Sequence, residues 1–218
     1  HLLSRRQRQM CIRDRGRILV NKPKLLMLDE PFSALDIYLR ERLQAEMREL
    51  LKSYGGPVLL VTHSRDEAYR LCRSIAVMDK GSTTPPRLTK ELFEDPHTVA
   101  VASLTGCKNI SKAEKRGEHQ LYAVDWGVTL STAAELHDGL CAVGVRAHDI
   151  HEEERHNRYA IVCGQSIEDP FELTQPFTFA CQGDKKMLLW VKLQRREPYS
   201  APKEVGIAPD KVLPLYEK

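Results

Sequence analysis

The stretch Leu25 to Asp36, LLMLDEPFSALD, decides the fold expected for the first half of the chain. Apolar residues run into two adjacent carboxylates, Asp29 and Glu30, and a proline and a short polar turn follow at once. A continuous apolar run is typical of a parallel strand that is covered on both faces. In open parallel sheets, ligands bind beyond the carboxyl ends of the strands. The pattern therefore predicts that both carboxylates face a ligand.

Strand and helix patterns alternate around this stretch, from residue 17 to about 105. After Asp36, apolar residues recur at helical spacing until YGGP (54–57) ends the pattern. VLLVT (58–62) predicts a second buried strand, and Ser64 to Glu67 has the form of a capping box that opens a helix through Leu71. SIAVMDKG (74–81) predicts a third strand that closes on a Lys-Gly turn. Such alternation indicates a parallel α/β sheet with right-handed crossovers.

The second half of the chain has a different rhythm. A helical stretch at 89–106 is interrupted by Pro96. After Cys107, short apolar runs are separated by Gly, Asp, Asn and Pro, which predicts strands, with QGDKK (182–186) as a hairpin loop. We therefore expect an α/β domain over residues 1–106, followed over residues 107–218 by a small all-β domain, a barrel or sandwich, for which an OB-like barrel is the specific prediction.

Composition narrows the class of protein. The 218 residues are 42% hydrophobic and 29% charged, which is ordinary for a soluble globular protein, and the net charge of +3 is too weak to argue for nucleic acid. The longest apolar runs are strand-sized, so we expect no membrane-spanning segment, and no secretion signal is visible. The six cysteines form no CxxC pair and are expected to be reduced thiols of a cytoplasmic protein. The eight histidines lack metal-ligand spacing, and HDIHEEERH (148–156) predicts a solvated loop.

A polar cluster is expected where the first two strands end. Ser33 and Asp36 lie in the turn after Glu30, and His63 follows Thr62 at the end of the second strand. An Asp, a Glu and a His at adjacent strand ends suit a Mg²⁺-bound phosphate and an activated water. The alternative is an Asp-Glu pair that merely opens a surface turn.

Two of these segments resemble the ATP-binding-cassette (ABC) ATPases. LLMLDEPFSALD is similar to their Walker B strand, catalytic glutamate and D-loop, and LLVTHSRDEAYRLCRSIAVMDKG (59–81) to the switch histidine and the strand beyond it. The resemblance implies ATP and Mg²⁺ as cofactors and a P-loop-type nucleotide-binding domain. It also implies that Asp29 holds Mg²⁺ through water, Glu30 is the general base and His63 contacts the γ-phosphate. Ser33 and Asp36 would then couple the two nucleotide sites of an ATPase dimer.

The chain departs from this family towards its N-terminus. No GxxxxGK[ST] phosphate loop is present, so we expect the chain to be the C-terminal fragment of a cassette. LSRRQ (3–7) stands where the family has LSGGQ, which makes Ser4 and Gln7 the matching nucleotide-binding positions. MCIRDR (10–15) interrupts the following helix and resembles translated sequencing-adapter sequence, which predicts that residues 1 to about 16 are partly an assembly artefact. The alternative is a divergent signature on a surface helix.

Two further segments indicate which kind of cassette this is. Residues 91–110, ELFEDPHTVAVASLTGCKNI, are similar to the linker of the molybdate, sulfate, sugar and iron importers, and VGVRAHDI (143–150) resembles a motif of their β domain. The resemblance implies the ATP-hydrolysing subunit of an importer, with molybdate or a related oxyanion as the cargo. Arg146, His148 and Ser166 in the β domain are interpreted as ordinary surface groups.

The implied partners follow from this assignment. They are integral membrane permease subunits, a second ATPase copy and, indirectly, a periplasmic or extracellular substrate-binding protein, with no nucleic acid. The location would be peripheral, on the cytoplasmic face of the cell membrane. One alternative is a non-transport ABC ATPase of DNA repair or translation, which predicts a coiled-coil insertion or strong basic patches. Another is an ATPase-dead regulatory remnant.

Overall fold

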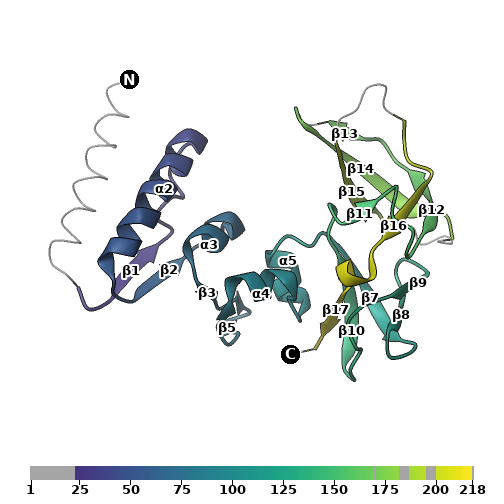
Figure 1. Ribbon diagram of the computed structural model, residues 1–218, viewed down its shortest axis with the longest axis horizontal. Coiled ribbons are helices and arrows are strands. Elements are labelled where there is room, and N and C mark those ends of the chain that lie inside the picture. The colour runs from purple at the N-terminus through teal and green to yellow at the C-terminus, as the bar shows by residue number, and fades with distance from the viewer. Residues whose placement is uncertain (1–22, 169, 182–186, 195–199, 218) are drawn as a thin grey trace. The chain divides into compact units, whose positions relative to one another are not determined.

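The structure is a computed structural model that describes residues 23–168, 170–181, 187–194 and 200–217. The chain divides into two compact units, the first ending at Ile75 and the second beginning at Ala76. Each unit is described by itself below (Figure 1). The predictions for Ser4, Gln7 and residues 1–16 lie outside the described residues.

The first unit is a small parallel α/β layer. Its elements are β1 (Leu26–Asp29), α2 (Ile37–Tyr54), β2 (Val58–Val61), α3 (Arg65–Leu71) and β3 (Ser74–Ile75). β1 and β2 pair in parallel, with Leu26 opposite Val58 and Asp29 opposite Val61. This confirms the parallel α/β prediction for this part of the chain and sets the carboxyl ends of both strands side by side.

Local sequence signals set both ends of α2. The Asp36 carboxylate accepts a hydrogen bond from the Leu39 amide at 2.9 Å, which satisfies one of the free N–H groups of the first turn. At the other end Gly55 adopts a φ of +67°, the left-handed conformation that glycine reaches without strain. Between these caps, Leu43 and Met47 are buried and pack with Phe32. The amphipathic helix predicted from apolar spacing is therefore confirmed.

The two-stranded sheet is covered on one face within the described residues. Side chains alternate between the faces of a strand. Leu26 is buried, and Leu28 on the same face packs against Leu43 and Met47 of α2. On the other face Met27 is 65% exposed, and Leu59 and Val61, which face the same way on β2, are about half exposed. The prediction of a strand covered on both faces is thus wrong for the described part of the chain.

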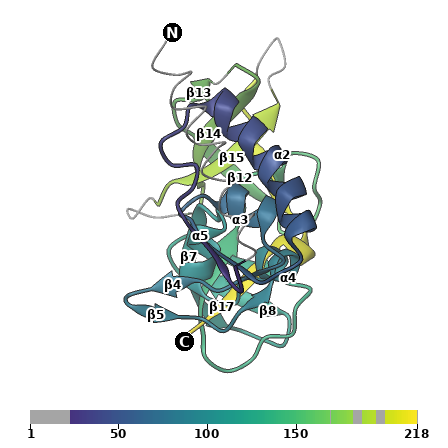
Figure 2. The ribbon, with the colours of Figure 1, turned by 90° about the vertical axis from the view of Figure 1, so that its left-hand side faces the viewer.

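The second unit opens with a hairpin instead of the predicted third parallel strand. β4 (Met78–Asp79) and β5 (Ser82–Thr83) pair antiparallel across Lys80 and Gly81, and Figure 2 shows them as a narrow two-stranded hairpin. The φ values of Lys80 and Gly81, +47° and +78°, are those of a tight two-residue turn. The Lys-Gly turn was predicted correctly, but it folds the segment back on itself.

Antiparallel strands make up most of the second unit. One sheet has the order β17-β10-β7-β8-β9, and the other has the order β11-β16-β12-β14-β13 with β15 paired to β14. Their bounds are β7 Asn109–Lys115, β8 Gln120–Ala123, β9 Val128–Ser131, β10 Leu140–Val145, β11 Ile150–His151, β12 Tyr159–Cys163, β13 Ile167–Glu168, β14 Glu172–Phe179, β15 Leu189–Gln194, β16 Glu204–Ile207 and β17 Leu213–Tyr216. A short 3-10 helix, η1 (Pro209–Lys211), precedes β17.

A single core joins these two sheets. Trp126 and Leu130 from the first sheet's region pack in one buried cluster with Phe177 and Phe179 of β14. The all-β prediction is therefore confirmed for this half, while the OB-like barrel stays a prediction. The QGDKK loop lies outside the described residues, and β14 and β15 pair antiparallel on either side of it.

Two short helices precede the β-sheets in the second unit. β6 (Arg87–Leu88) leads into α4 (Thr89–Glu94), and α5 (Val99–Leu104) follows beyond Pro96, as predicted. Ala102 and Cys107 pack with Ala142 and Leu215, so these helices belong to the second unit. The domain limit at 106/107 stays a prediction about sequence organisation. In the part of the chain that the structure describes, no helix combines the length and the apolar character needed to cross a bilayer.

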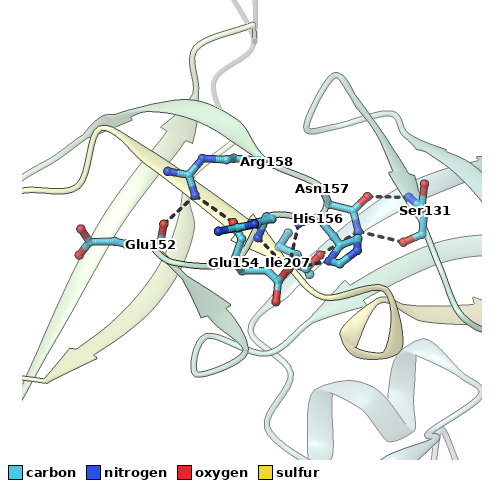
Figure 3. A network of polar contacts seen from close by, with 8 residues as sticks. Ser131, Glu152, Glu154, His156, Asn157, Arg158 and Ile207 are labelled. Carbon is cyan, nitrogen blue, oxygen red and sulfur yellow. Dashed lines mark hydrogen bonds and ion pairs between the residues drawn. The ribbon is translucent and has the colours of Figure 1, made fainter.

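Asn157 links the two sheets through its side chain. Its φ is +43°, and its amide oxygen accepts from the Ser131 N–H at 2.7 Å. Its amide nitrogen donates to the carbonyls of Ser131 and Ile207, both at 2.9 Å (Figure 3). Ser131 ends β9 in one sheet and Ile207 ends β16 in the other, so one side chain ties both sheets together.

Candidate functional site

The ends of β1 and β2 bring Glu30 and His63 together. The Glu30 amide donates to the Val61 carbonyl at 2.9 Å, which extends the strand pairing by one residue. Beyond it, His63 Nδ1 lies 2.9 Å from Glu30 Oε1. Both side chains are open to solvent, 45% exposed for Glu30 and 73% for His63, so a ligand can reach them. The structure thus joins two residues that the sequence placed at adjacent strand ends.

The backbone of Glu30 is held in an uncommon conformation. Its φ is +40°, in the left-handed region, which costs a non-glycine residue roughly 1–2 kcal/mol. Its carbonyl accepts hydrogen bonds from the Ser33 amide at 3.2 Å and the Ser33 hydroxyl at 3.0 Å. The Glu30 amide is thus held by Val61 and the Glu30 carbonyl by Ser33. These contacts fix the Glu30 backbone and so direct its side chain towards His63.

Asp29 is the last residue of β1 and is exposed. Among the described residues no hydrogen bond or ion pair engages its carboxylate, and no group of three metal-ligating side chains occurs there. Mg²⁺ is commonly held by one or two carboxylates, with water and substrate phosphates completing its coordination. The exposed Asp29 carboxylate, next to Glu30 at the end of β1, is of the chemical type that can contact a Mg²⁺-nucleotide.

The side chains of Ser33 and Asp36 make hydrogen bonds within their own chain. The Ser33 hydroxyl donates to the Glu30 carbonyl, and Asp36 caps α2. The predicted nucleotide-binding and dimer-coupling roles of these two residues stay predictions, and so do those of Ser4 and Gln7.

The sequence did not mark Thr62, Glu67 and Gln44 as site residues. Thr62 donates its hydroxyl hydrogen to the buried Glu67 at 2.6 Å, and the Gln44 amide lies 3.4 Å from the same carboxylate. Ser64 caps α3 through the Glu67 amide at 3.4 Å, as the capping box predicted. The signal for Glu67 was present in that box, but the sequence did not reveal that its side chain turns to Thr62.

The acidic loop of the second unit is a hydrogen-bonded turn. The Glu154 carboxylate accepts from the amides of Arg155 and His156 at 2.8 and 2.9 Å and lies 2.7 Å from His156 Nδ1 (Figure 3). These contacts, the His156 backbone bond first, lower the pKa of Glu154. Arg158 donates to the carbonyls of Glu152 and Glu154 at 2.7 and 2.9 Å. The contacts give this loop a structural role, and the described residues gather no metal-ligand set there.

Arg146 is not the ordinary surface group that the sequence suggested. Its guanidinium donates to the Thr105 carbonyl at 2.7 Å, the Phe93 carbonyl at 2.5 Å and the Thr105 hydroxyl at 3.3 Å. A guanidinium carries five N–H donors in a fixed fork, so it can hold several acceptors at once. Arg146 therefore fastens the end of β10 to α4 and the end of α5. His148, in contrast, is exposed, and Ser166 is half-buried.

Comparison with known proteins gives the chain its relatives. The spermidine/putrescine import ATP-binding protein PotA of Clostridium novyi is 40% identical over 95 residues, which cover 44% of this chain and 27% of that protein. The Fe(3+) ions import ATP-binding protein FbpC of Mannheimia succiniciproducens is 35% identical over 133 residues, 60% of this chain and 38% of the relative. The chain is related to the ATP-binding subunits of ABC importers. No family model matches it.

These importer relatives are longer than the chain. The FbpC protein of Pasteurella multocida aligns over 141 residues, 64% of this chain and 40% of its own length, at 35% identity. The chain thus spans about a quarter to two fifths of the relatives it matches. The names of these relatives differ in cargo, since they name spermidine and putrescine in one case and Fe(3+) ions in the other.

Proposed function

We propose that this chain is part of the ATP-hydrolysing subunit of an ABC importer, and that the carboxyl edge of β1 and β2 carries the chemistry. The observation that carries the proposal is the 2.9 Å contact between Glu30 and His63. A carboxylate beside an imidazole, open to solvent at the end of parallel strands, is suited to activate a water next to a bound phosphate.

Each residue has a distinct proposed role. One Glu30 oxygen faces His63, and the other is available to accept a proton from the attacking water. With both ring nitrogens protonated, His63 would donate from Nδ1 to Glu30 and from Nε2, on the ring edge away from Glu30, to the γ-phosphate. Asp29 would hold Mg²⁺ through water, and bound Mg²⁺ supplies neutralisation of the phosphate charge. Ser4, Gln7, Ser33 and Asp36 are proposed as nucleotide-contacting residues of an ATPase dimer.

The proposal for the parent protein includes its assembly. Hydrolysis by two ATPase copies would drive two permease subunits, with an external substrate-binding protein as an indirect partner and the ATPase peripheral to the cytoplasmic face of the membrane. A subunit that hydrolyses ATP but does not cross the bilayer can drive transport only by docking on membrane subunits.

The identity of the cargo is the most specific part of the proposal. The segments GCKNI (106–110) and GVRAHDI (144–150) favour molybdate or a related oxyanion. The names of the relatives point instead to polyamines or ferric iron. Uptake by cells that carry the parent transporter, measured with molybdate, sulfate, spermidine and ferric iron in parallel, decides among them, and uptake of either of the last two alone would contradict the oxyanion proposal.

The central test is hydrolysis by the parent protein. We expect ATP hydrolysis that rises when the parent is reconstituted with its permease subunits in vesicles. Stimulation by nucleic acid or ribosomes, without any response to the permease, would favour the repair or translation alternative. The 218-residue chain itself is expected not to hydrolyse ATP, since it has no phosphate loop. Micromolar ATP binding to this chain, measured by calorimetry, would refute that part of the proposal.

A further inference from the structure

A buried carboxylate is hydrogen-bonded to Thr62, the residue before His63. Glu67, in the first turn of α3, is only 4% exposed. One of its oxygens accepts a hydrogen bond from the Thr62 hydroxyl at 2.6 Å, and the other accepts from the Gln44 amide at 3.4 Å. Carboxylates are seldom this buried unless specific partners satisfy them. Glu67 therefore has a defined task inside the first unit.

Gln44 extends this network into α2. It is 6% exposed, and its amide oxygen accepts a hydrogen bond from Arg70 at 3.3 Å. The positive charge of Arg70 is thus linked to the Glu67 carboxylate through an amide. Side chains from α2, from α3 and from the residue after β2 are joined in one polar network around the buried Glu67 and Gln44, while Thr62 is half-buried and Arg70 is exposed. Such a network is rigid when every member is satisfied.

The network brackets His63 in the sequence. The Thr62 hydroxyl, which donates to Glu67, also accepts from the Ser64 amide at 3.0 Å and so spans the backbone of His63. The Ser64 hydroxyl in turn accepts from the Glu67 amide at 3.4 Å. Both neighbours of His63 are therefore tied to Glu67, one through its carboxylate and one through its backbone.

The His63 side chain has little else to direct it. It is 73% exposed, so packing does not hold it, and its direction depends on its backbone. We propose that Glu67 is a positioning residue which acts through Thr62 to hold the His63 backbone so that the imidazole meets Glu30. This inference deepens the proposed function and rests on it as far as His63 acts in hydrolysis.

The test is nuclear magnetic resonance of the histidine imidazoles in the whole 218-residue chain, which requires no ATP. The His63 signals are assigned by their loss in His63→Gln, and Glu30→Gln gives the reference for a changed Glu30 contact. In Glu67→Leu we expect the His63 signals to shift towards this reference while those of the other histidines stay in place. Glu67→Gln, whose amide oxygen can still accept from Thr62, should restore the wild-type signals.

A matched control is available on the same helical turn. Asp66 is an exposed carboxylate next to Glu67, and Asp66→Asn should leave the His63 signals unchanged. If Glu67→Leu does not fold, Thr62→Val decides, since it removes the bridging hydroxyl at nearly constant shape, and Thr62→Ser should restore the contact.

Unchanged His63 signals in a folded Glu67→Leu or Thr62→Val variant would overturn the inference, as would a Glu30→Gln variant that leaves them unmoved. The proposed function fails separately. A parent protein that does not hydrolyse ATP refutes the enzyme assignment but does not alter the spectroscopic result.

Discussion

His63 Nδ1 lies 2.9 Å from Glu30 Oε1, although 33 positions separate the two residues in the chain. The contact exists because β1 and β2 are parallel neighbours, so that the residues after each strand emerge at the same edge of the sheet. Each side chain follows its strand by one or two residues. The function proposed for this edge would therefore depend on a pairing that the sequence makes predictable.

Removal of the Glu30 charge should separate binding from hydrolysis. In the parent protein, Glu30→Gln keeps the shape of the side chain but removes the base, so hydrolysis should fall by about a hundredfold or more while ATP binding is kept. Steady-state phosphate release and nucleotide binding measure the two effects. Glu41→Gln, an exposed glutamate of α2, is the control and should retain wild-type turnover. Near-wild-type hydrolysis by Glu30→Gln would sink the general-base assignment, and His63→Ala should lose hydrolysis in the same way.

The proximity of Glu30 and His63 was predictable because it follows from the parallel pairing of two adjacent strands. The polar network of Thr62, Glu67 and Gln44 was harder to predict. The capping box marked Ser64 and Glu67, but the sequence could not tell that Glu67 reaches Thr62 or that Gln44 of α2 lies beside it. Those contacts depend on how the two helices pack on the strands, and helix packing leaves no local pattern in a single sequence.

Long-range hydrogen bonds from a side chain to the backbone could not be predicted from the sequence either. Arg146 was interpreted as a surface group because its acceptors are carbonyls, 41 and 53 positions away, and any residue type can supply a carbonyl. The prediction of a third parallel strand in SIAVMDKG (74–81) was wrong for another reason. Its apolar run resembles a buried strand, and only the positive φ of Lys80 reveals a hairpin.

Loss of Arg146 should destabilise the second unit. Arg146→Met keeps the apolar stem but removes the hydrogen bonds of the guanidinium to the Phe93 and Thr105 carbonyls, at a cost of about 1–3 kcal/mol in unfolding free energy. Arg146→Lys should recover only part of this, since an ammonium lacks the planar fork. Urea unfolding of the 218-residue chain measures the loss, with Arg155→Met on an exposed arginine as the control. Equal midpoints for Arg146→Met and the wild type would show that the tether contributes nothing.

Cys107 should be the slowest of the second unit's thiols to react. Burial raises the pKa of Cys107 to about 11, with nearby Arg146 opposing the shift only in part. At pH 8, roughly one such thiol in a thousand is ionised, and only the thiolate is nucleophilic. Alkylation with iodoacetamide at pH 8, followed by mass spectrometry, should label the exposed Cys181 well before Cys107. Equal labelling rates for the two cysteines in the folded chain would contradict the burial of Cys107.

The same raised pKa predicts how stability depends on pH. The folded-state pKa of Cys107 lies above its ordinary value of 9.0, so the folded state binds this proton more tightly than the unfolded state does. The contribution of the protonated Cys107 thiol to the free energy of unfolding is complete below about pH 9. It is lost as the pH rises towards 11. Unfolding midpoints measured between pH 8 and 11 should fall, and Cys107→Ala should flatten that fall. An equally steep fall in Cys107→Ala would assign it to other groups.

Asp36 has two roles to separate, a helix cap that the structure contains and a proposed contact across an ATPase dimer. Because its carboxylate accepts from the Leu39 amide at 2.9 Å, Asp36→Ala should destabilise the first unit by about 1 kcal/mol. Asp36→Ser keeps a capping oxygen but removes the charge, so it should restore most of the stability. In the parent protein that carries Glu30→Gln and saturating ATP, sedimentation should show weaker dimerisation with either substitution if the charge faces the second copy. Dimerisation that recovers fully in Asp36→Ser would mean that Asp36 supports the dimer only by capping α2. A Glu30→Gln parent that stays monomeric with saturating ATP would remove the dimer from the proposed mechanism.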